Sequence, residues 1–85
     1  MFVVQCTKND AGTARLGMAV STRNAGNSVV RNRIRRLIRE SFRMHRQDLP
    51  ALDFLVTARP AAASAENRVV FASLAAHWQR VKAKA

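Results

Sequence analysis

Arginine side chains give this chain its most distinctive chemistry, because seven of them fall within residues 30–46. The guanidinium group is planar, keeps its charge at neutral pH and can donate two parallel hydrogen bonds to phosphate oxygens. If residues 30–46 form a helix, successive side chains turn by about 100° around its axis. One arc of roughly 140° to 240° then holds only polar and basic side chains, namely Asn32, Arg35, Arg36, Arg39, Arg43 and Arg46. We expect this face to bind a nucleic acid backbone.

The opposite side of the same helix is apolar, which predicts burial against a core. The side chains within about 40° of Val30 are Ile34, Leu37, Ser41 and Met44, and Ile38 and Phe42 lie at one edge. A merely solvated helix face is the alternative for the arginines. It is not favoured, because exposed faces normally mix charges of both signs.

The charge balance of the whole chain favours a polyanionic partner. Its 85 residues include 15 Lys and Arg against 5 Asp and Glu, a net charge of +10 at pH 7. Self-repulsion of this size costs stability, and a polyanion relieves it. The length predicts a single domain over residues 1–85. A lone cysteine fits a reducing, cytoplasmic setting, and the chain has neither a signal-peptide pattern nor an apolar run long enough to span a membrane.

Two strands are expected before the arginine helix. Residues 2–7 are rich in β-formers, a turn containing Asn9, Asp10 and Gly12 follows, and residues 15–21 alternate between larger apolar and small side chains. This pattern predicts an antiparallel hairpin.

The remaining elements complete an α+β fold. Asn27 or Ser28 can cap a helix over residues 29–45, and residues 54–58 form a compact apolar run typical of a buried strand. Ser64 can cap a last helix in which apolar residues recur at helical spacing up to Trp78 and beyond. The predicted order is β-β-α-β-α, a two-layer α/β sandwich.

Linked motifs carry a resemblance to a known family. Residues 15–21 read Arg-Leu-Gly-Met-Ala-Val-Ser, Gly26 and Asn27 follow, and residues 31–39 read Arg-Asn-Arg-Ile-Arg-Arg-Leu-Ile-Arg. This arrangement resembles the protein subunit of bacterial ribonuclease P, in which an Arg-Asn-Arg-x-x-Arg-x-x-Arg helix follows an Arg-x-Gly-x-x-Val-Ser strand. The pairs Leu49-Pro50, Asp53-Phe54 and Ala58-Arg59 also look like the family.

The resemblance implies specific features of the fold. The strand before the arginine helix is expected to reach a parallel strand by a left-handed crossover, although chain geometry alone predicts a right-handed one in about 98% of cases. Family members usually begin with a helix and a first strand before the segment that matches residues 2–7, so this chain looks truncated or unusually short. That lead-in supplies aromatic side chains to a cleft for the single-stranded leader of precursor tRNA. Here Val3 and Gln5 would floor the cleft, and the chain has no tyrosine.

The resemblance also implies a function. The chain would be the RNA-binding subunit of the ribonuclease P ribonucleoprotein, which assists a catalytic RNA in the endonucleolytic removal of the 5′ leader from precursor tRNA. Catalysis and Mg²⁺ would belong to the RNA, with no catalytic residue, metal site or cofactor on the protein, and neither a membrane nor DNA is an expected partner. The residues assigned to RNA contact are Arg15, Arg23, Asn27, Arg31, Asn32, Arg33, Arg35, Arg36, Arg39 and Arg43.

Some of these residues admit a structural role. Arg31 and Arg33 flank the apolar stripe and could pair with Glu40 or Asp53 instead of RNA. Asn32 could be an ordinary surface residue.

Apart from the arginines, few residue types in this chain suit catalysis. His45 and His77 are far apart in the sequence, and each is expected to have a surface or packing role. We expect Cys6 to be a small buried side chain and Trp78 to belong to the core.

Two other functions remain open from the residues alone. A ribosomal or ribosome-assembly protein could carry an equally basic helix. A basic amphipathic helix can also lie on an anionic membrane.

Overall fold

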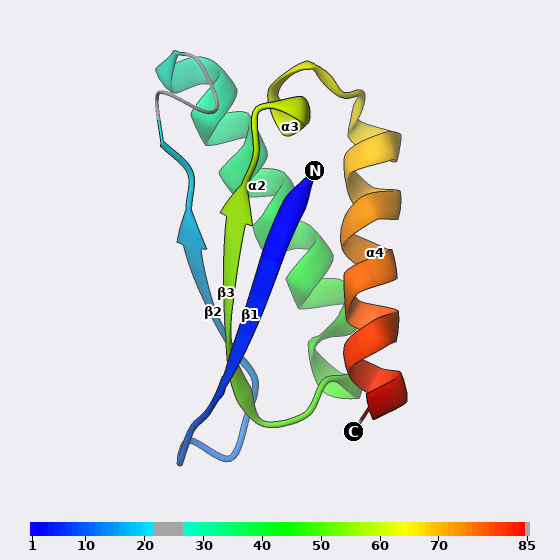
Figure 1. Cartoon of the computed structure of the whole chain (residues 1–85). Coiled ribbons are helices and arrows are strands. Elements are labelled where there is room, and N and C mark those ends of the chain that lie inside the picture. The colour runs from blue at the N-terminus through cyan, green and yellow to red at the C-terminus, as the bar shows by residue number, and fades with distance from the viewer. Residues whose placement is uncertain (22–26, 85) are drawn as a thin grey trace.

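The computed structural model describes residues 1–21 and 27–84 and shows a sheet covered by helices (Figure 1). The elements in chain order are β1 (Phe2–Lys8), β2 (Arg15–Ala19), α2 (Ser28–His45), the 3₁₀ turn η1 (Arg46–Asp48), β3 (Leu52–Ala58), α3 (Ala61–Ser64) and α4 (Asn67–Lys84). The predicted order of strands and long helices is confirmed, and two short helical segments are added.

The sheet has the order β1-β3-β2, with β3 in the centre. β1 runs antiparallel to β3, where Phe2 lies opposite Ala58, and β2 runs parallel to β3, where Arg15 lies opposite Asp53. The predicted hairpin between β1 and β2 is therefore wrong. The turn between them, with Gly12 at φ 72°, does reverse the chain. However, β3 lies between the two strands that this turn connects. The residues of a turn do not indicate whether the strands on either side of it pair directly.

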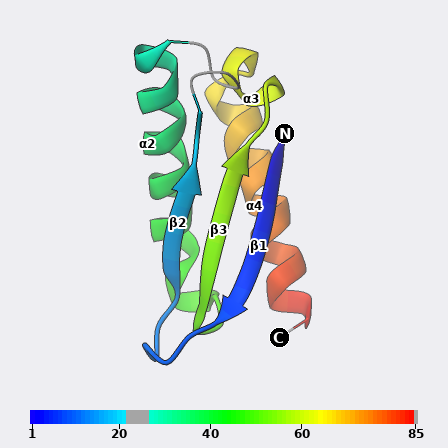
Figure 2. The same ribbon diagram turned by 60° about the vertical axis from the view of Figure 1, so that its left-hand side comes forward.

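The connection from β2 through α2 to β3 is left-handed. In Figures 1 and 2, β2 and β3 both point upwards with β3 to the right of β2, and in Figure 1 α2 passes behind the sheet. The chain thus leaves the top of β2, descends behind the sheet and enters β3 on the right. This arrangement confirms the crossover implied by the family resemblance against the usual preference.

Helix α2 begins where the sequence predicts. The Asn27 side chain caps the helix by accepting a hydrogen bond from the Val30 amide at 3.0 Å. The helix starts one residue before the predicted position and ends, as predicted, at His45. Most of its predicted apolar side is buried, including Ile34 and Leu37, but Met44 is 70% exposed, which makes the prediction wrong at that residue.

Helix α4 begins differently from the prediction. Ser64 is the last residue of the short helix α3, whereas α4 starts at Asn67 and the Glu66 carbonyl accepts hydrogen bonds from the amides of its first turn. The prediction that Ser64 caps the last helix is wrong. Pro60 starts a separate short helix that buries Ala62, and the last helix therefore begins only after that short helix has ended.

Aromatic rings join the two layers at the centre of the core. Phe42 from α2, Phe54 from β3 and Trp78 from α4 meet edge to face, with ring centroids 5.8 to 5.9 Å apart. The Trp78 indole N–H donates to the Ser41 hydroxyl at 2.9 Å, and both residues are buried. The prediction that Trp78 is a core residue is confirmed.

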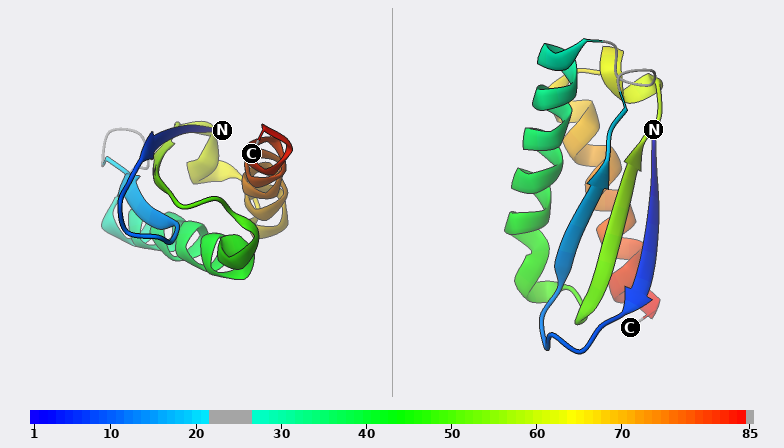
Figure 3. Two further views of the ribbon diagram at one scale, coloured as in Figure 1. Left: turned by 90° about the horizontal axis from the view of Figure 1, so that it is seen from below. Right: turned by 90° about the vertical axis from the view of Figure 1, so that its left-hand side faces the viewer.

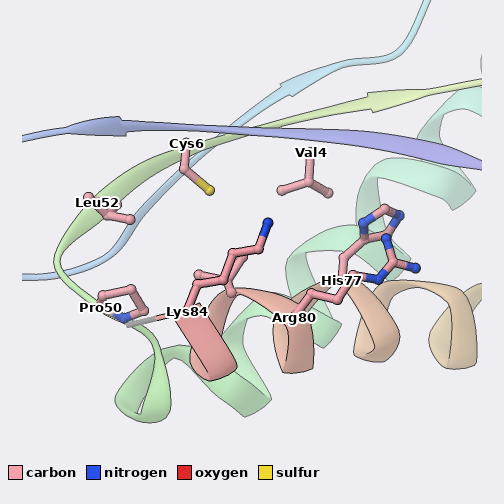
Figure 4. A pocket seen from close by; sticks show the side chains of 8 residues that line it. Val4, Cys6, Pro50, Leu52, His77, Arg80 and Lys84 are labelled. Carbon is pink, nitrogen blue, oxygen red and sulfur yellow. The ribbon is translucent and has the colours of Figure 1, made fainter.

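In residues 1–21 and 27–84, the helices cover one face of the sheet and leave the other open (Figure 3). Val3 and Leu55 on the open face are 39% and 41% exposed. Cys6 points to the helix side but is exposed, which makes the prediction of a buried cysteine wrong. It lies on an edge strand of the described sheet and lines a hollow between β1 and α4 (Figure 4).

We predict that Ser41→Ala lowers the free energy of unfolding by about 1–3 kcal/mol, because it leaves the buried Trp78 N–H without an acceptor. Urea denaturation followed by far-UV circular dichroism measures this loss. Ser64→Ala is the matched control and should change the free energy of unfolding by less than about 0.5 kcal/mol, since Ser64 is exposed. Equal effects of the two substitutions would contradict the importance of the indole hydrogen bond.

Candidate nucleic-acid interface

The exposed side of α2 presents basic side chains without acidic partners. Arg36, Arg39 and Arg43 are exposed, as is Asn32 among them. The ion pairs between described residues involve other basic residues, namely Arg15, Arg68 and Lys82. Because no carboxylate in residues 1–21 and 27–84 pairs with the helix arginines, their charges are available to an external anion. We call Asn32, Arg36, Arg39 and Arg43 the arginine face.

The helix backbone adds to this positive potential. The first turn of α2 contains no acidic residue, so its partial positive charge is not neutralised locally. Asn27 uses its side-chain oxygen for the cap, which leaves its amide group as the part that could donate to RNA. Arg23, the other predicted contact in this region, lies outside the described residues.

Arg33 points to the other helices rather than to the arginine face. Its guanidinium donates to the Asn67 side-chain oxygen at 2.9 and 2.7 Å and to the Ala65 carbonyl. It therefore ties α2 to the segment that connects α3 and α4. The acidic partners considered from the sequence, Glu40 and Asp53, are not the groups that bind it.

Helical spacing places Arg31 and Arg35 on the flank of α2 away from Arg33. Both are partly buried, and no described group accepts a hydrogen bond from the buried Nε of Arg31. Arg46 projects from the same flank and donates from Nε to the Ala14 carbonyl, just before β2, at 3.1 Å. This flank therefore borders the sheet, and Arg31 has an unused donor there.

Arg15 is held by an acidic residue of the neighbouring strand. Its Nε and Nη2 lie 2.7 and 3.0 Å from the two carboxylate oxygens of Asp53, and Asn9 donates to the same carboxylate at 3.0 Å. These hydrogen bonds, from Arg15 first and Asn9 second, hold the pKa of the Asp53 carboxyl below its ordinary value, and the pairing raises the pKa of Arg15. Sequence reasoning missed this cluster, because Asn9 and Asp53 are 44 positions apart.

The predicted floor of the leader cleft lies on the open face of the sheet. Val3 and Gln5 point away from the helices and are exposed. Leu55 separates Gln5 from Gly17 in the same cross-strand row. At Gly17 a Cβ atom would lie 3.6 Å from the Leu55 side chain, so the surface is low and flat there. A shallow hollow of about 310 Å³ at this row also includes Arg15.

Comparison with known proteins fits this geometry. The profile of the family described as Ribonuclease P matches residues 1–82. The chain belongs to the ribonuclease P protein family. It is 44% identical over 80 residues to the ribonuclease P protein component of Thioalkalivibrio sulfidiphilus, covering 94% of this chain and 67% of that protein. It is 42% identical over 72 residues to the component from Escherichia coli O157:H7, covering 85% of this chain and 60% of that protein.

Solved structures of the ribonuclease P protein share its fold. The Staphylococcus aureus protein superposes with a TM-score of 0.85 at 37% identity, covering 94% of this chain and 72% of that one. The Thermotoga maritima protein superposes with a TM-score of 0.82 at 29% identity and 76% coverage of that chain. The present chain thus spans 60–67% of the curated relatives described above. The family favours the ribonuclease P interpretation over a ribosomal protein.

Among residues 1–21 and 27–84, no three His, Cys, Asp or Glu side chains gather as metal ligands. His45 contacts the Ser41 carbonyl of its own helix at 2.8 Å, whereas His77 faces β1 from α4. Over the same residues, no helix is both long and apolar enough to cross a bilayer.

We predict that Asp53→Asn lowers the melting temperature at pH 7, because the carboxylate accepts three hydrogen bonds that its charge strengthens. A carboxyl whose pKa is lowered by folding stabilises the protein above its unfolded pKa, and this stabilisation disappears as the pH falls through the folded pKa. The difference between parent and variant should therefore shrink below about pH 4. Thermal denaturation at pH 7 and pH 3 tests this, with Asp10→Asn as the control. A difference that stays constant with pH would contradict the charged pairing.

Proposed function

We propose that this chain is the RNA-binding protein component of ribonuclease P. In this role it assists the catalytic RNA in removing the 5′ leader from precursor tRNA in the cytoplasm. The observation that carries the proposal is the arginine face, which has no acidic partner among the described residues of a chain that belongs to this family. A surface of this kind binds phosphates without reading their sequence.

The arginine face is assigned to the catalytic RNA. Its guanidiniums can each release counterions from a phosphate, and this release drives association. The helix is rigid because its opposite side is buried in the core, so the side chains project from a fixed backbone. Asn32 can donate and accept hydrogen bonds within the same face.

The open face of the sheet is assigned to the single-stranded leader. Val3 and Gln5 lie on this face at β1, and α2, where Arg31 and Arg35 are partly buried, lies near the opposite edge at β2. None of the aromatic rings points from this face, because Phe2, Phe42, Phe54 and Trp78 are buried and Phe71 belongs to α4. Leader binding would therefore depend on arginine and hydrogen-bonding groups rather than on base stacking.

The chemical step is assigned to the RNA, with Mg²⁺ held by RNA supplying activation of the attacking water. The protein contributes by neutralising phosphate charge, which otherwise opposes close packing of the catalytic RNA and its substrate. This contribution should matter most at low Mg²⁺, where few metal ions screen the RNA.

We predict that Arg36→Ala and Arg39→Ala each weaken binding to a ribonuclease P RNA. Each should also flatten the plot of log K against log salt concentration by about one unit per lost phosphate contact. Filter binding at several salt concentrations measures the slope. Arg33→Ala is the matched control from the same helix, because its guanidinium is held by Asn67 and Ala65. It should lower thermal stability more than the other two variants and change the slope less. An unchanged slope for Arg36→Ala and Arg39→Ala would contradict the assignment.

We predict that the chain stimulates 5′ cleavage of precursor tRNA by a bacterial ribonuclease P RNA at low Mg²⁺. Gel analysis of a labelled precursor measures the rate with and without the protein. The RNA alone at high Mg²⁺ is the control that shows a folded, competent RNA. Tight RNA binding without stimulation of cleavage would refute the proposed role and indicate a different RNA partner.

A further inference from the structure

The beginning of α2 contributes little to the hydrophobic core of the described chain. None of residues 28–33 is buried, Val30 packs against the core only in part, and the first buried side chain of the helix is that of Ile34. In the right-hand view of Figure 3, this end of α2 extends past the arrowhead of β2. Asn32, which belongs to the arginine face, lies in this segment. Core packing therefore holds the start of the arginine face less firmly than the rest.

Hydrogen bonds from Arg33 join this end of α2 to the other helices. The guanidinium donates from Nε and Nη2 to Oδ1 of Asn67, at 2.9 and 2.7 Å, and Nη2 also donates to the Ala65 carbonyl. Asn67 is the first residue of α4, and Ala65 follows directly after α3. Hydrogen bonds depend on direction as well as distance. These three therefore fix where the start of α2 lies relative to α4.

Two points of attachment thus define the course of α2. One is the buried hydrogen bond between Ser41 and Trp78, and the other is the set of hydrogen bonds made by Arg33. Ser41 follows Arg33 by eight residues, which is about 12 Å along the helix axis. A contact at one point restrains rotation about the axis, whereas a second point is needed to restrain tilting. The arginine face extends from Asn32 to Arg43, so its direction depends on both points.

We propose that Asn67 is a positioning residue for RNA binding, which acts through Arg33 and does not itself touch RNA. This inference rests on the proposed binding of RNA by the arginine face. A helix end that is free to move must be ordered when RNA binds, and this ordering reduces affinity. Because Asn67 holds the start of α2 in place beforehand, the ordering is already complete in the free protein.

The geometry of Arg33 favours positioning over direct contact with a phosphate. Its side chain lies about 60° around the helix from Arg36 and turns towards α4. The edge formed by Nε and Nη2, one of those that can bind a phosphate through two hydrogen bonds, already donates to protein oxygens. A phosphate contact contributes to the salt dependence of binding. A positioning residue instead changes affinity at every salt concentration and leaves the slope as it is.

Filter binding to a ribonuclease P RNA at several salt concentrations tests the proposal. Asn67→Ala should weaken binding by about two- to thirtyfold, the range for residues that modulate a distant site, and should keep the parental slope. Gln79→Ala is the matched control, because Gln79 is exposed on α4 twelve residues beyond Asn67, and it should not alter affinity. Parental affinity of Asn67→Ala would overturn the proposal. A flattened slope would also overturn it, since it would show the loss of a phosphate contact.

Asn67→Asp distinguishes positioning from charge. Aspartate keeps an oxygen atom in the place of Oδ1 and can bind Arg33 through charge-assisted hydrogen bonds. Its added negative charge, however, opposes the approach of RNA. Positioning predicts that Asn67→Asp binds RNA more tightly than Asn67→Ala, whereas charge alone predicts the reverse order. Circular dichroism at the temperature of the assay checks that both variants are folded. The reverse order between folded variants would overturn the proposal.

A double-mutant cycle tests whether Asn67 acts through Arg33. If it does, the double variant Arg33→Ala/Asn67→Ala should bind RNA no more weakly than Arg33→Ala alone. Losses of affinity that simply add would overturn Arg33 as the link between α4 and the arginine face.

NMR of the protein without RNA tests the positioning independently. In Asn67→Ala, residual dipolar couplings of the backbone amides should be averaged towards smaller values in residues 28–33 and should stay parental in residues 36–43. Unchanged couplings in residues 28–33 would overturn the proposal. Failure of the parent itself to bind RNA would overturn the proposed function and this inference together. Equal binding by the parent and Asn67→Ala would overturn this inference alone.

Discussion

The contact between α2 and the aromatic centre of the core determines where the arginines point. Phe42 packs against Phe54 and Trp78, and the Ser41 hydroxyl beside it accepts the indole N–H. A helix held at two adjacent positions cannot rotate about its axis without breaking the ring contacts or the hydrogen bond. Because each residue turns by about 100°, fixing that side fixes the opposite one as well. The direction of the arginine face is therefore a consequence of core packing rather than of interactions among the arginines.

Three of the five acidic residues form ion pairs away from the arginine face, which stays charged. Asp53 lies on the central strand and binds Arg15, whereas Asp48 approaches Lys82 and Glu66 binds Arg68 on α4. Each of these pairs relieves repulsion away from the arginine face. Arg33 lowers the density of positive charge on the arginine face in another way. Its side chain turns towards α4 and donates hydrogen bonds to an uncharged side-chain oxygen. The remaining repulsion on α2 costs stability in the free protein and is the part that a polyanion can relieve.

Structural features that depend on residues close together in the chain could be predicted from the sequence. The cap at Asn27, the extent of α2 and the buried side of that helix all follow from local spacing, and the structure confirms them. The pairing of strands did not follow, because a turn at Gly12 reverses the chain equally well with or without β3 between β1 and β2. The partners of Arg33 and Arg15 are 32 to 38 positions away, so no pattern of local spacing identifies them. The left-handed crossover came only from family resemblance, against the general preference.

The insertion of β3 between β1 and β2 determines what lies beside each edge of the described sheet. An antiparallel hairpin would have placed β1 beside β2, close to the arginine-bearing helix. Instead the two strands form opposite edges, with α2 near β2 and α4 near β1 (Figure 2). Near the β2 edge, Arg46 donates a hydrogen bond to the Ala14 carbonyl. Beside β1, the apolar side chains of Val4, Leu52 and Val81 line a hollow that Arg80 and Lys84 also border. The width of the sheet therefore separates α2 and its arginine face from β1.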